Sequence, residues 1–417
     1  MRGTRRPPTP TPTPTRLEKA GAHHVSMLVW NTFQHDARVR SEGETLANAG
    51  YRVVIHALHA PDITERKETL ASGIVVVRHG RMPGKRQSQP RGAAARRSGI
   101  GILRRLFASL LTQFAMIFAI VRSRPDVVHA HDVNMLASGW LATRLLRVPL
   151  VYDAHEISTG REGYEAIRGT VAALEKRIMP RAAGTITTTD ARAKFFARAY
   201  RIPRPVVLQN RPRSWMGGGP STCIRDELCL ENDWPIILYQ GGLQPGRGLE
   251  DLVHAAADIP RAYFVFVGGG SLYTALTALT GELGLESRVK FIDTVPLDEL
   301  PWYTASADIG VQPIENTCLN HFTTDSNKLF EYVMAGLPVV ASRLPEIRRV
   351  VQAHELGLLV SPGNRGELIA ALSRLVSDSD LRAHYAANSR KAAKTLNWES
   401  QEQALLDLYE SVLHPKR

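Results

Sequence analysis

The chain has 417 residues, of which 44% are hydrophobic and 22% charged, the balance of an ordinary folded globular protein. This composition excludes a wholly disordered chain, a collagen-like fibre and a disulfide-rich secreted scaffold. The three cysteines, Cys223, Cys229 and Cys318, form no C-x-x-C pair and no Cys/His cluster. We therefore expect a reducing, cytoplasmic compartment and no structural zinc.

The net charge of +12 is concentrated in two short segments. Residues 1–20 contribute +4, and residues 78–105 hold nine Lys or Arg and no acid, which leaves the rest close to neutral. A nucleic-acid-binding protein more often spreads its cations over a folded face, so we expect no nucleic-acid partner. The first twenty residues are rich in Thr, Pro and Arg without an apolar run, which predicts a disordered tail and no secretory signal.

Residues 21–210 alternate short apolar runs with helical stretches. The apolar runs are mostly continuous, as in strands that are buried on both faces of a parallel sheet. The pattern therefore predicts a doubly wound α/β domain. We predict strands over 25–30, 52–58, 74–78, 126–129, 149–152, 184–187 and 206–208, and helices over 37–49, 100–121, 136–146 and 170–178.

A Gly/Pro-rich linker, 211–222, precedes a second alternating pattern that predicts another doubly wound domain over 223–397. We expect the two domains to face each other across a cleft, and helix 398–417 to return to the N-terminal domain. The predicted strands are 236–239, 263–267, 289–292, 309–312, 338–342 and 358–360, and the helices are 249–257, 272–283, 297–306, 327–335, 364–377, 380–394 and 398–413.

The longest apolar stretch, Leu106–Val121, follows the basic segment directly. Its sixteen residues are fewer than the ~20 that a spanning helix needs, which favours a buried or interfacial helix. Cations beside an apolar helix suit an anionic membrane surface, and we expect residues 78–121 to contact one. The alternative is a solvated loop whose charge only keeps the protein soluble.

A glycine-rich loop, YQGGLQPGRGLEDLVHA over 239–255, joins a predicted strand to a predicted helix. Glycines such as Gly241 and Gly242 let the backbone approach a phosphate, and the helix start offers free N–H groups. Arg247 adds a fixed positive charge. These features favour phosphate binding over a plain turn that happens to carry a surface arginine.

Two further segments of the second half are candidates for ligand contact. FVFVGGGS, which contains Gly268 and Gly269, matches a dinucleotide fingerprint incompletely and equally suits a tight turn. SNKLFEYVMAGLPVVAS places Lys328 and Glu331 in the first turns of a helix. A carboxylate there suits the vicinal hydroxyls of a ribose, and the alternative is a weak surface ion pair.

In the first half, acids and histidines follow two neighbouring strands. DVVHAHD supplies His129, His131 and Asp132, and VYDAHE supplies Asp153, His155 and Glu156. Because the carboxyl ends of parallel strands meet at one edge, we expect these groups at a common site. No spacing typical of metal ligands occurs, and the single D-x-D, Asp378–Asp380, lies between predicted helices, so we predict no metal.

GGLQPGRG, VGGGS and NKLFEYVMAGLPVV, with their spacing, resemble the C-terminal domain of the group 1 (family 4) retaining glycosyltransferases. HDARVRSEGETLANAGYRV, VVHAHDVNML, VYDAHE and VVLQNRP are similar to that family's N-terminal domain. The resemblance implies the GT-B fold of two Rossmann-like domains. It implies transfer of a hexose-type sugar from a nucleotide-diphosphate sugar to a carbohydrate or lipid-linked acceptor, in polysaccharide or glycolipid biosynthesis, without a metal or other cofactor.

The resemblance also assigns residues. Arg247 matches the cation that binds the donor diphosphate, Glu331 the ribose-binding glutamate, and His155 a histidine near the transferred sugar. This chain has Gly242 where the family often has arginine, and Thr323 where it has a first glutamate. We expect a catalytic set of His155, Arg247 and Lys328, a donor set of Gly241, Gly242, Arg247, Gly268, Gly269, Asp325, Lys328 and Glu331, and an acceptor set of Asp36, His131, Asp132 and Glu156.

The sequence is also compatible with other functions. A transferase acting on a soluble small molecule would share all of these motifs. A nucleotide-sugar hydrolase or epimerase of the same fold would release product without an acceptor. A noncatalytic membrane- or nucleic-acid-binding protein would use only the basic segments, and a nicotinamide dehydrogenase is disfavoured by the incomplete fingerprint.

Overall fold

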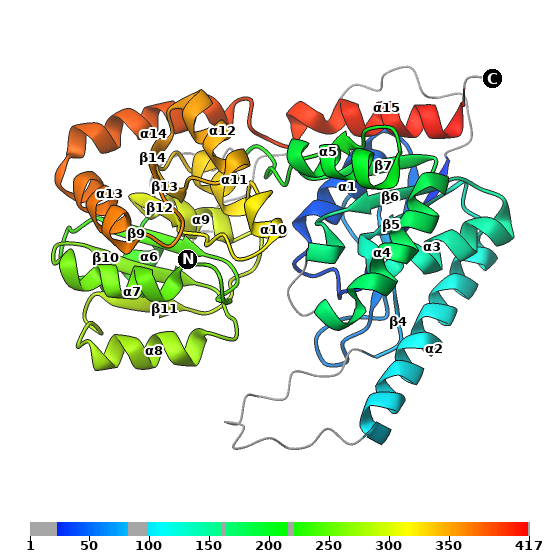
Figure 1. The fold of residues 1–417 in the computed structure, drawn as a ribbon, viewed down its shortest axis with the longest axis horizontal. Coiled ribbons are helices and arrows are strands. Elements are labelled where there is room, and N and C mark those ends of the chain that lie inside the picture. Colours follow the sequence, from blue (N-terminus) through cyan, green and yellow to red (C-terminus); the bar gives the residue numbers. More distant parts are fainter. Residues whose placement is uncertain (1–22, 82–98, 161–163, 216–220, 416–417) are drawn as a thin grey trace, which may run out of the picture.

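The computed structural model describes residues 23–81, 99–160, 164–215 and 221–415. Within them the chain forms two α/β halves, each with a sheet covered by helices (Figure 1). The predicted tail 1–20 lies outside the described residues, as do most of the basic segment and part of the linker.

The sheet of the first half has the strand order β3-β4-β2-β1-β5-β6-β7-β8, in which β3 alone runs antiparallel to its neighbour. The chain builds outward from β1 on one side and then restarts at β5 on the other. This switch point opens a crevice at the carboxyl ends of β1 and β5. The strands are β1 His24–Leu28, β2 Arg52–Leu58, β3 Lys67–Thr69, β4 Val75–His79, β5 Val127–His131, β6 Leu150–Ala154, β7 Gly184–Thr187 and β8 Val206–Val207.

Five α-helices connect these strands. Asp36 caps the first of them, since its carboxylate accepts the Val39 amide at 3.1 Å. The last was not predicted, although Thr189 caps it by accepting the Arg192 amide. The helices are α1 Ala37–Asn48, α2 Gly99–Ser123, α3 Asp132–Leu146, α4 Arg168–Ile178 and α5 Asp190–Tyr200.

The second half contains a six-stranded, wholly parallel sheet with the order β11-β10-β9-β12-β13-β14. Its switch point lies between β9 and β12, so the glycine-rich loop after β9 borders the crevice. The strands are β9 Ile236–Gln240, β10 Tyr263–Val267, β11 Val289–Ile292, β12 Ile309–Gln312, β13 Val339–Ser342 and β14 Gly357–Val360.

The helices of this half cover both faces of its sheet. Three of them, at 223–227, 319–322 and 345–354, were not predicted, although Pro345 occupies the first turn of the last. These helices are α6 Cys223–Glu227, α7 Leu249–Asp258, α8 Tyr273–Glu282, α9 Leu300–Ala305, α10 Leu319–Phe322, α11 Asn327–Met334, α12 Pro345–His354, α13 Arg365–Ser377 and α14 Ser379–Ala393.

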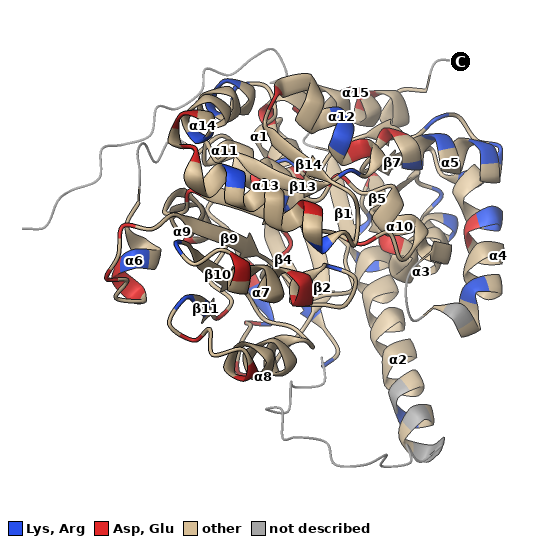
Figure 2. Cartoon of the chain, turned by 60° about the vertical axis from the view of Figure 1, so that its left-hand side comes forward, with Lys and Arg blue, Asp and Glu red and all other residues tan. Residues whose placement is uncertain are grey.

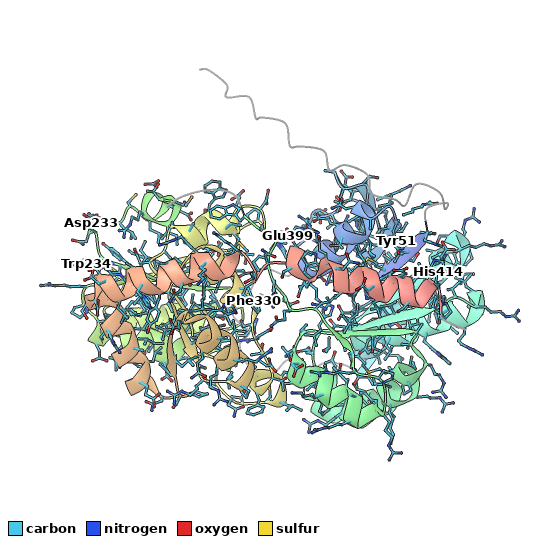
Figure 3. The ribbon with its side chains drawn as sticks, turned by 90° about the horizontal axis from the view of Figure 1, so that it is seen from above. Tyr51, Asp233, Trp234, Phe330, Glu399 and His414 are labelled. Carbon is cyan, nitrogen blue, oxygen red and sulfur yellow. The ribbon has the colours of Figure 1, made fainter. Side chains whose placement is uncertain are left out.

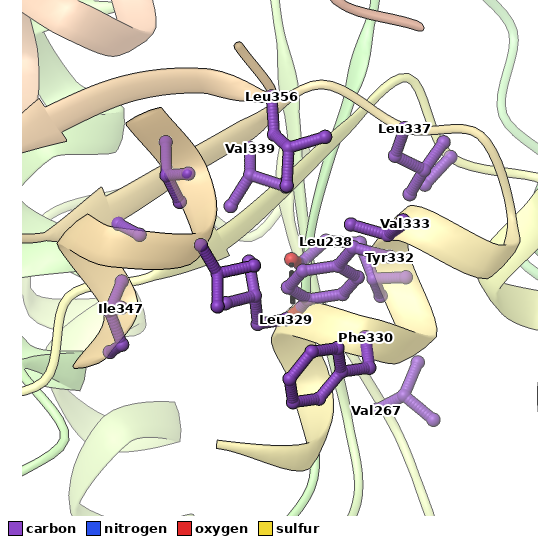
Figure 4. Packing of buried hydrophobic residues seen from close by; sticks show 14 of the residues in the cluster. Leu238, Val267, Leu329, Phe330, Tyr332, Val333, Leu337, Val339, Ile347 and Leu356 are labelled. Carbon is purple, nitrogen blue, oxygen red and sulfur yellow. Dashed lines mark hydrogen bonds between the residues drawn. The ribbon is translucent and has the colours of Figure 1, made fainter. Parts of the chain in front are cut away.

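Tyr332 fixes α11 against the sheet (Figure 4). Its hydroxyl lies 3.1 Å from the Leu238 and Val311 carbonyl oxygens, and it accepts the Gln240 amide. The ring lies against Gly310, where a Cβ atom would come within 2.4 Å of it. Because the neighbouring residue on this helix is Glu331, the packing of Tyr332 also sets the position of that carboxylate.

The last helix, α15 Glu402–Leu413, packs on the first half of the chain (Figures 1 and 3). Its residues Leu405 and Tyr409 share a buried core with Val25 and Leu46. Glu399 lies where the chain crosses between the halves, and Tyr51 lies near the far end of the helix (Figure 3). The chain therefore connects the two halves twice.

Arg213, in the linker, joins the two crossings. Its guanidinium donates to Glu44 at 3.1 Å and to Glu402 at 2.8 Å. The Trp398 amide donates to the Pro212 carbonyl at 2.9 Å. The described part of the linker is thus hydrogen-bonded both to α1 and to the second crossing segment.

Candidate active site

The carboxyl ends of the two sheets border an interdomain cleft. A cavity of about 330 Å³ lies between the first turns of α1 and the second half. It is lined by Arg38, Arg40 and Ser41 from the first half and by Leu297, Thr304, Asn327 and Glu331 from the second. Of the donor residues predicted from the sequence, Glu331 alone lines this cavity, which therefore borders the donor site rather than containing it.

The glycine-rich loop interlocks with the turn after β10. Gly268 has a φ of 133°, and a Cβ atom there would lie 2.4 Å from the Gly241 carbonyl oxygen. The Leu243 amide donates to the Gly269 carbonyl at 3.1 Å. Gly241, Gly242 and Gly269 remain exposed, so the two loops form one backbone surface that a phosphate can approach closely.

Arg247, Lys328 and Glu331 come together beside this surface. Lys328 Nζ lies 5.1 Å from the centre of the Tyr239 ring and against Gly241. Burial, with the charge of Arg247 added, lowers the pKa of Lys328 to about 7, although Glu331 opposes the shift. Arg247 and Lys328 repel each other when both are charged, and a bound polyanion would relieve that repulsion.

Glu331 extends from α11 toward the cavity. One carboxylate oxygen accepts the Gln240 side-chain amide at 2.6 Å. Burial raises the pKa of Glu331, while the Gln240 bond and Lys328 limit that rise. Within the described part of the chain no hydrogen bond reaches the other oxygen, so it can accept a ligand hydroxyl.

On the opposite rim, His155 lies between two carboxylates. Its Nε2 is 2.9 Å from Asp153 Oδ2, and its Nδ1 is 3.5 Å from Asp132 Oδ2. Burial alone would lower the pKa of His155, but the two carboxylates raise it to about 10. The imidazole is therefore a cation at neutral pH, able to donate rather than accept protons.

Two residues lie beneath His155: Asp153, which the sequence had placed among the strand-end acids, and Arg38, which the sequence interpretation missed. Asp153 is fully buried, and Arg38 Nε and Nη2 donate to its oxygens at 2.7 and 3.0 Å. The charge of Arg38 helps to hold the pKa of Asp153 well below its usual range, against the effect of burial. Arg38 also donates to the Leu208 carbonyl. The pair of Arg38 and Asp153 therefore links His155 to the segment just before the linker.

The other predicted residues have varied surroundings. Asp36 caps α1, and its second carboxylate oxygen accepts the Asn31 amide at 2.7 Å. His131 is buried, with Nδ1 3.2 Å from His155 Nε2, so it lies beneath the rim.

Two other predicted acids bond to side-chain amides. Glu156 accepts the Asn320 amide at 3.3 Å. Asp325 is buried and accepts the Gln209 amide at 2.7 Å, away from the glycine loops.

Arg192 connects the two rims and was not singled out from the sequence. Its guanidinium donates to the His155 carbonyl at 2.6 Å, to the Asn320 carbonyl at 3.2 Å and to Thr323 Oγ1 at 3.2 Å. Thr323 occupies the position where the family has its first glutamate. In this chain the position therefore receives a cation from the opposite domain.

Four buried side chains lie close enough to hold a metal ion, namely Glu42, His129, His131 and Asp153. Arg38 already occupies this cluster, since it binds Asp153 bidentately and lies 3.2 Å from Glu42. Burial raises the pKa of Glu42 well above its usual range, so that group tends toward its neutral form. The donor set does not fit a resident cation, because a guanidinium compensates its charge.

Two Rossmann-like domains with glycine loops, cations and a carboxylate at the cleft define a glycosyltransferase of the GT-B fold. The profile described as "Glycosyl transferases group 1" matches residues 234–378, and that described as "Glycosyl transferase 4-like domain" matches 36–211. The chain belongs to the group 1 (family 4) glycosyltransferases.

Curated relatives include D-inositol 3-phosphate glycosyltransferases. The protein of that name from Xylanimonas cellulosilytica is 28% identical over 68% of this chain and 71% of its own length. The one from Thermomonospora curvata is 27% identical over 68% and 71%. These proteins show what the chain is similar to.

Solved structures show the same fold. Sucrose-phosphate synthase from Thermosynechococcus elongatus has a TM-score of 0.75 at 21% identity, covering 94% of this chain and all of its own. HepE from Anabaena, in complex with UDP-glucose, has a TM-score of 0.70 at 19% identity, covering 93% and 99%. At these identities the likeness concerns the fold alone.

Proposed function

We propose that the protein transfers a hexose-type sugar, with retention of configuration, from a nucleoside-diphosphate sugar to an acceptor hydroxyl. The observation that carries this proposal is the adjacency of Arg247, Lys328 and Glu331 at the glycine loops, on the opposite rim from His155. In this arrangement Glu331 binds the ribose, Arg247 and Lys328 bind the diphosphate, and His155 donates to a sugar hydroxyl. The UDP-glucose complex of HepE supports a donor of this class.

The reaction needs charge stabilisation more than a protein nucleophile. The bond from C1 to the β-phosphate oxygen breaks as the bond from C1 to the acceptor oxygen forms. The acceptor proton passes to the departing phosphate oxygen on the same face. Arg247 and Lys328 stabilise the negative charge on that phosphate, so side chains can supply the cations that a metal would otherwise provide.

We propose cytoplasmic, metal-independent transfer to a carbohydrate or lipid-linked acceptor in cell-surface polysaccharide or glycolipid biosynthesis. All three cysteines are free thiols, which supports a reducing compartment. The second candidate acceptor is a soluble small molecule, and the inositol phosphate named in the curated relatives favours it. Both candidates require the same donor site.

A screen of nucleoside-diphosphate sugars tests the proposal. The correct donor should raise the melting temperature, and mass spectrometry should then detect glycosylated product only when an acceptor is present. Activity should survive excess EDTA. Free sugar or epimer formed equally well without acceptor would instead identify a hydrolase or epimerase, and activity lost in EDTA and restored by Mg²⁺ would contradict metal independence.

A further inference from the structure

Helix α2 presents a continuous apolar face to solvent. Its side chains there are between 52% and 69% exposed, although each is a large hydrophobic residue. At ~100° per residue they fall within a sector of about 140° on one side of the helix. They are Leu103, Leu106, Phe107, Leu110, Leu111, Phe114 and Phe118, and we call them the apolar face of α2.

From Thr112 onward, the opposite side of α2 belongs to the core of the N-terminal half. Met116 and Ile120 are fully buried in the same cluster as Leu136. Gln113 accepts the Ser138 hydroxyl at 2.9 Å, which fixes α2 against α3. The window Leu106–Ser123 is apolar enough to cross a membrane, with a mean hydropathy of 1.7. Because its C-terminal half is packed on the domain, lipid can surround only the exposed side.

The sequence on both sides of the apolar face is strongly basic. Between Glu68 and Asp126 the sequence contains eleven Lys or Arg and no Asp or Glu. Of these cations, Arg81, Arg104, Arg122 and Arg124 are described and exposed. Figure 2 shows α2 extending below the rest of the molecule with no acidic residue along it.

The chain itself offers too little to cover this face. The segments outside the described residues contain only four large apolar residues, Met1, Leu17, Met82 and Met216. A second copy of the chain would bring an equal number of uncompensated cations against these, which opposes a symmetric pairing. An anionic lipid surface fits both the apolar face and the basic residues near it. Its hydrocarbon region accepts aromatic and aliphatic side chains, and its charged headgroups attract the cations.

The geometry points to a docking surface on α2 by which the protein binds, in the plane of the interface, to a membrane containing anionic lipid. At 1.5 Å per residue its 25 residues extend about 37 Å. The docking surface is separate from the donor site, so loss of binding leaves transfer to a soluble acceptor intact.

Cosedimentation of the full chain with vesicles tests this inference. With equal parts phosphatidylglycerol and phosphatidylcholine at low salt, the protein should pellet. Its partition coefficient should fall at least about tenfold with phosphatidylcholine alone or in high salt, since attraction to anionic lipid is screened. Equal recovery in the supernatant with both kinds of vesicle at low salt would overturn the inference.

Variants locate the surface. Phe114→Ser with Phe118→Ser should lower the partition coefficient at least about tenfold, because each removes a large apolar side chain from the interface. The matched control is Ile63→Ser with Leu283→Ser, which alters two exposed apolar residues outside α2 and should bind as the wild type does. An equal loss in both variants would contradict the assignment to α2.

Two other occupants give distinct results. A dimer in sedimentation velocity that requires Phe114 and Phe118, without vesicle binding, would show that a second copy covers the face. Protein that stays in the vesicle pellet after alkaline carbonate extraction would show that α2 spans the bilayer. Either result would overturn the inference that α2 docks on the membrane surface.

Discussion

The Nε2 atom of His155 lies 2.9 Å from Oδ2 of Asp153, a carboxylate with no exposed surface. The same carboxylate accepts two hydrogen bonds from the Arg38 guanidinium. Asp153 therefore orients an imidazolium on the rim of the cleft while its own charge is balanced from beneath. Both Asp153 and Asp132 raise the pKa of His155, but only Asp153 is also the buried partner of Arg38.

Asp153→Asn should destabilise the protein severely. The change removes the bidentate charge partner of the buried Arg38 guanidinium and leaves it only Glu42, 3.2 Å away. Breaking a buried pair in this way costs about 3–5 kcal/mol of unfolding free energy. Asp132→Asn is the control, because Asp132 is 34% exposed and its loss should cost less than about 1 kcal/mol. Urea unfolding followed by circular dichroism measures both, and equal losses would refute the distinction.

Asp132→Asn should instead alter the pH profile of turnover. The pKa of His155 is about 10, so its imidazolium persists from neutral pH up to that value. Removing one of its two carboxylates lowers that pKa, and the alkaline limb of kcat should move about one pH unit lower. The measurement is kcat against pH at saturating donor. An unchanged limb would mean that His155 carries no proton in turnover.

Donor affinity should weaken as the pH rises through neutrality. The pKa of Lys328 is lowered to about 7, so the free protein loses this cation above that pH, while a bound diphosphate requires it. Calorimetry with nucleoside diphosphate should show Kd increasing up to about tenfold per pH unit above 7. In Lys328→Gln the affinity for nucleoside diphosphate should be lower, and Kd should no longer rise with pH above 7. If Kd still rose with pH in this variant, a group other than Lys328 would be responsible.

Arg247→Ala should impair the transfer step. Loss of one preorganised cation at the leaving diphosphate should cost about 2–4 kcal/mol of transition-state stabilisation. Arg261→Ala, an exposed arginine on the same half, should react as the wild type does. Steady-state kinetics at saturating donor compares them, and wild-type turnover in Arg247→Ala would remove this residue from the mechanism.

The sheets follow from the sequence because their strands are continuous apolar runs. Both halves, and the crevices at their switch points, could be predicted from that pattern. Helix α12 was missed although its signals were present, with Pro345 at its start and Ile347, Val350 and Val351 on one face. Such short helices give a weak periodic signal over few turns.

The sequence could propose Arg247 and Glu331 as donor-binding residues because both stand in local motifs. The bond between Arg38 and Asp153 joins residues that are 115 positions apart, and no local pattern marks it. Arg192 likewise bonds across the cleft, from α5 to Thr323. Long-range partners of this kind depend on how the domains meet, which spacing within one segment does not specify.

The packing of α15 has a consequence for synthesis. Trp398, Leu405 and Tyr409 complete a core whose other members, such as Val25 and Leu46, are made nearly four hundred residues earlier. Those early residues lack their final neighbours until α15 has been synthesised. The core of the N-terminal domain is therefore completed only after the second domain has been made, and a fragment that stops at residue 210 would expose an unfinished core.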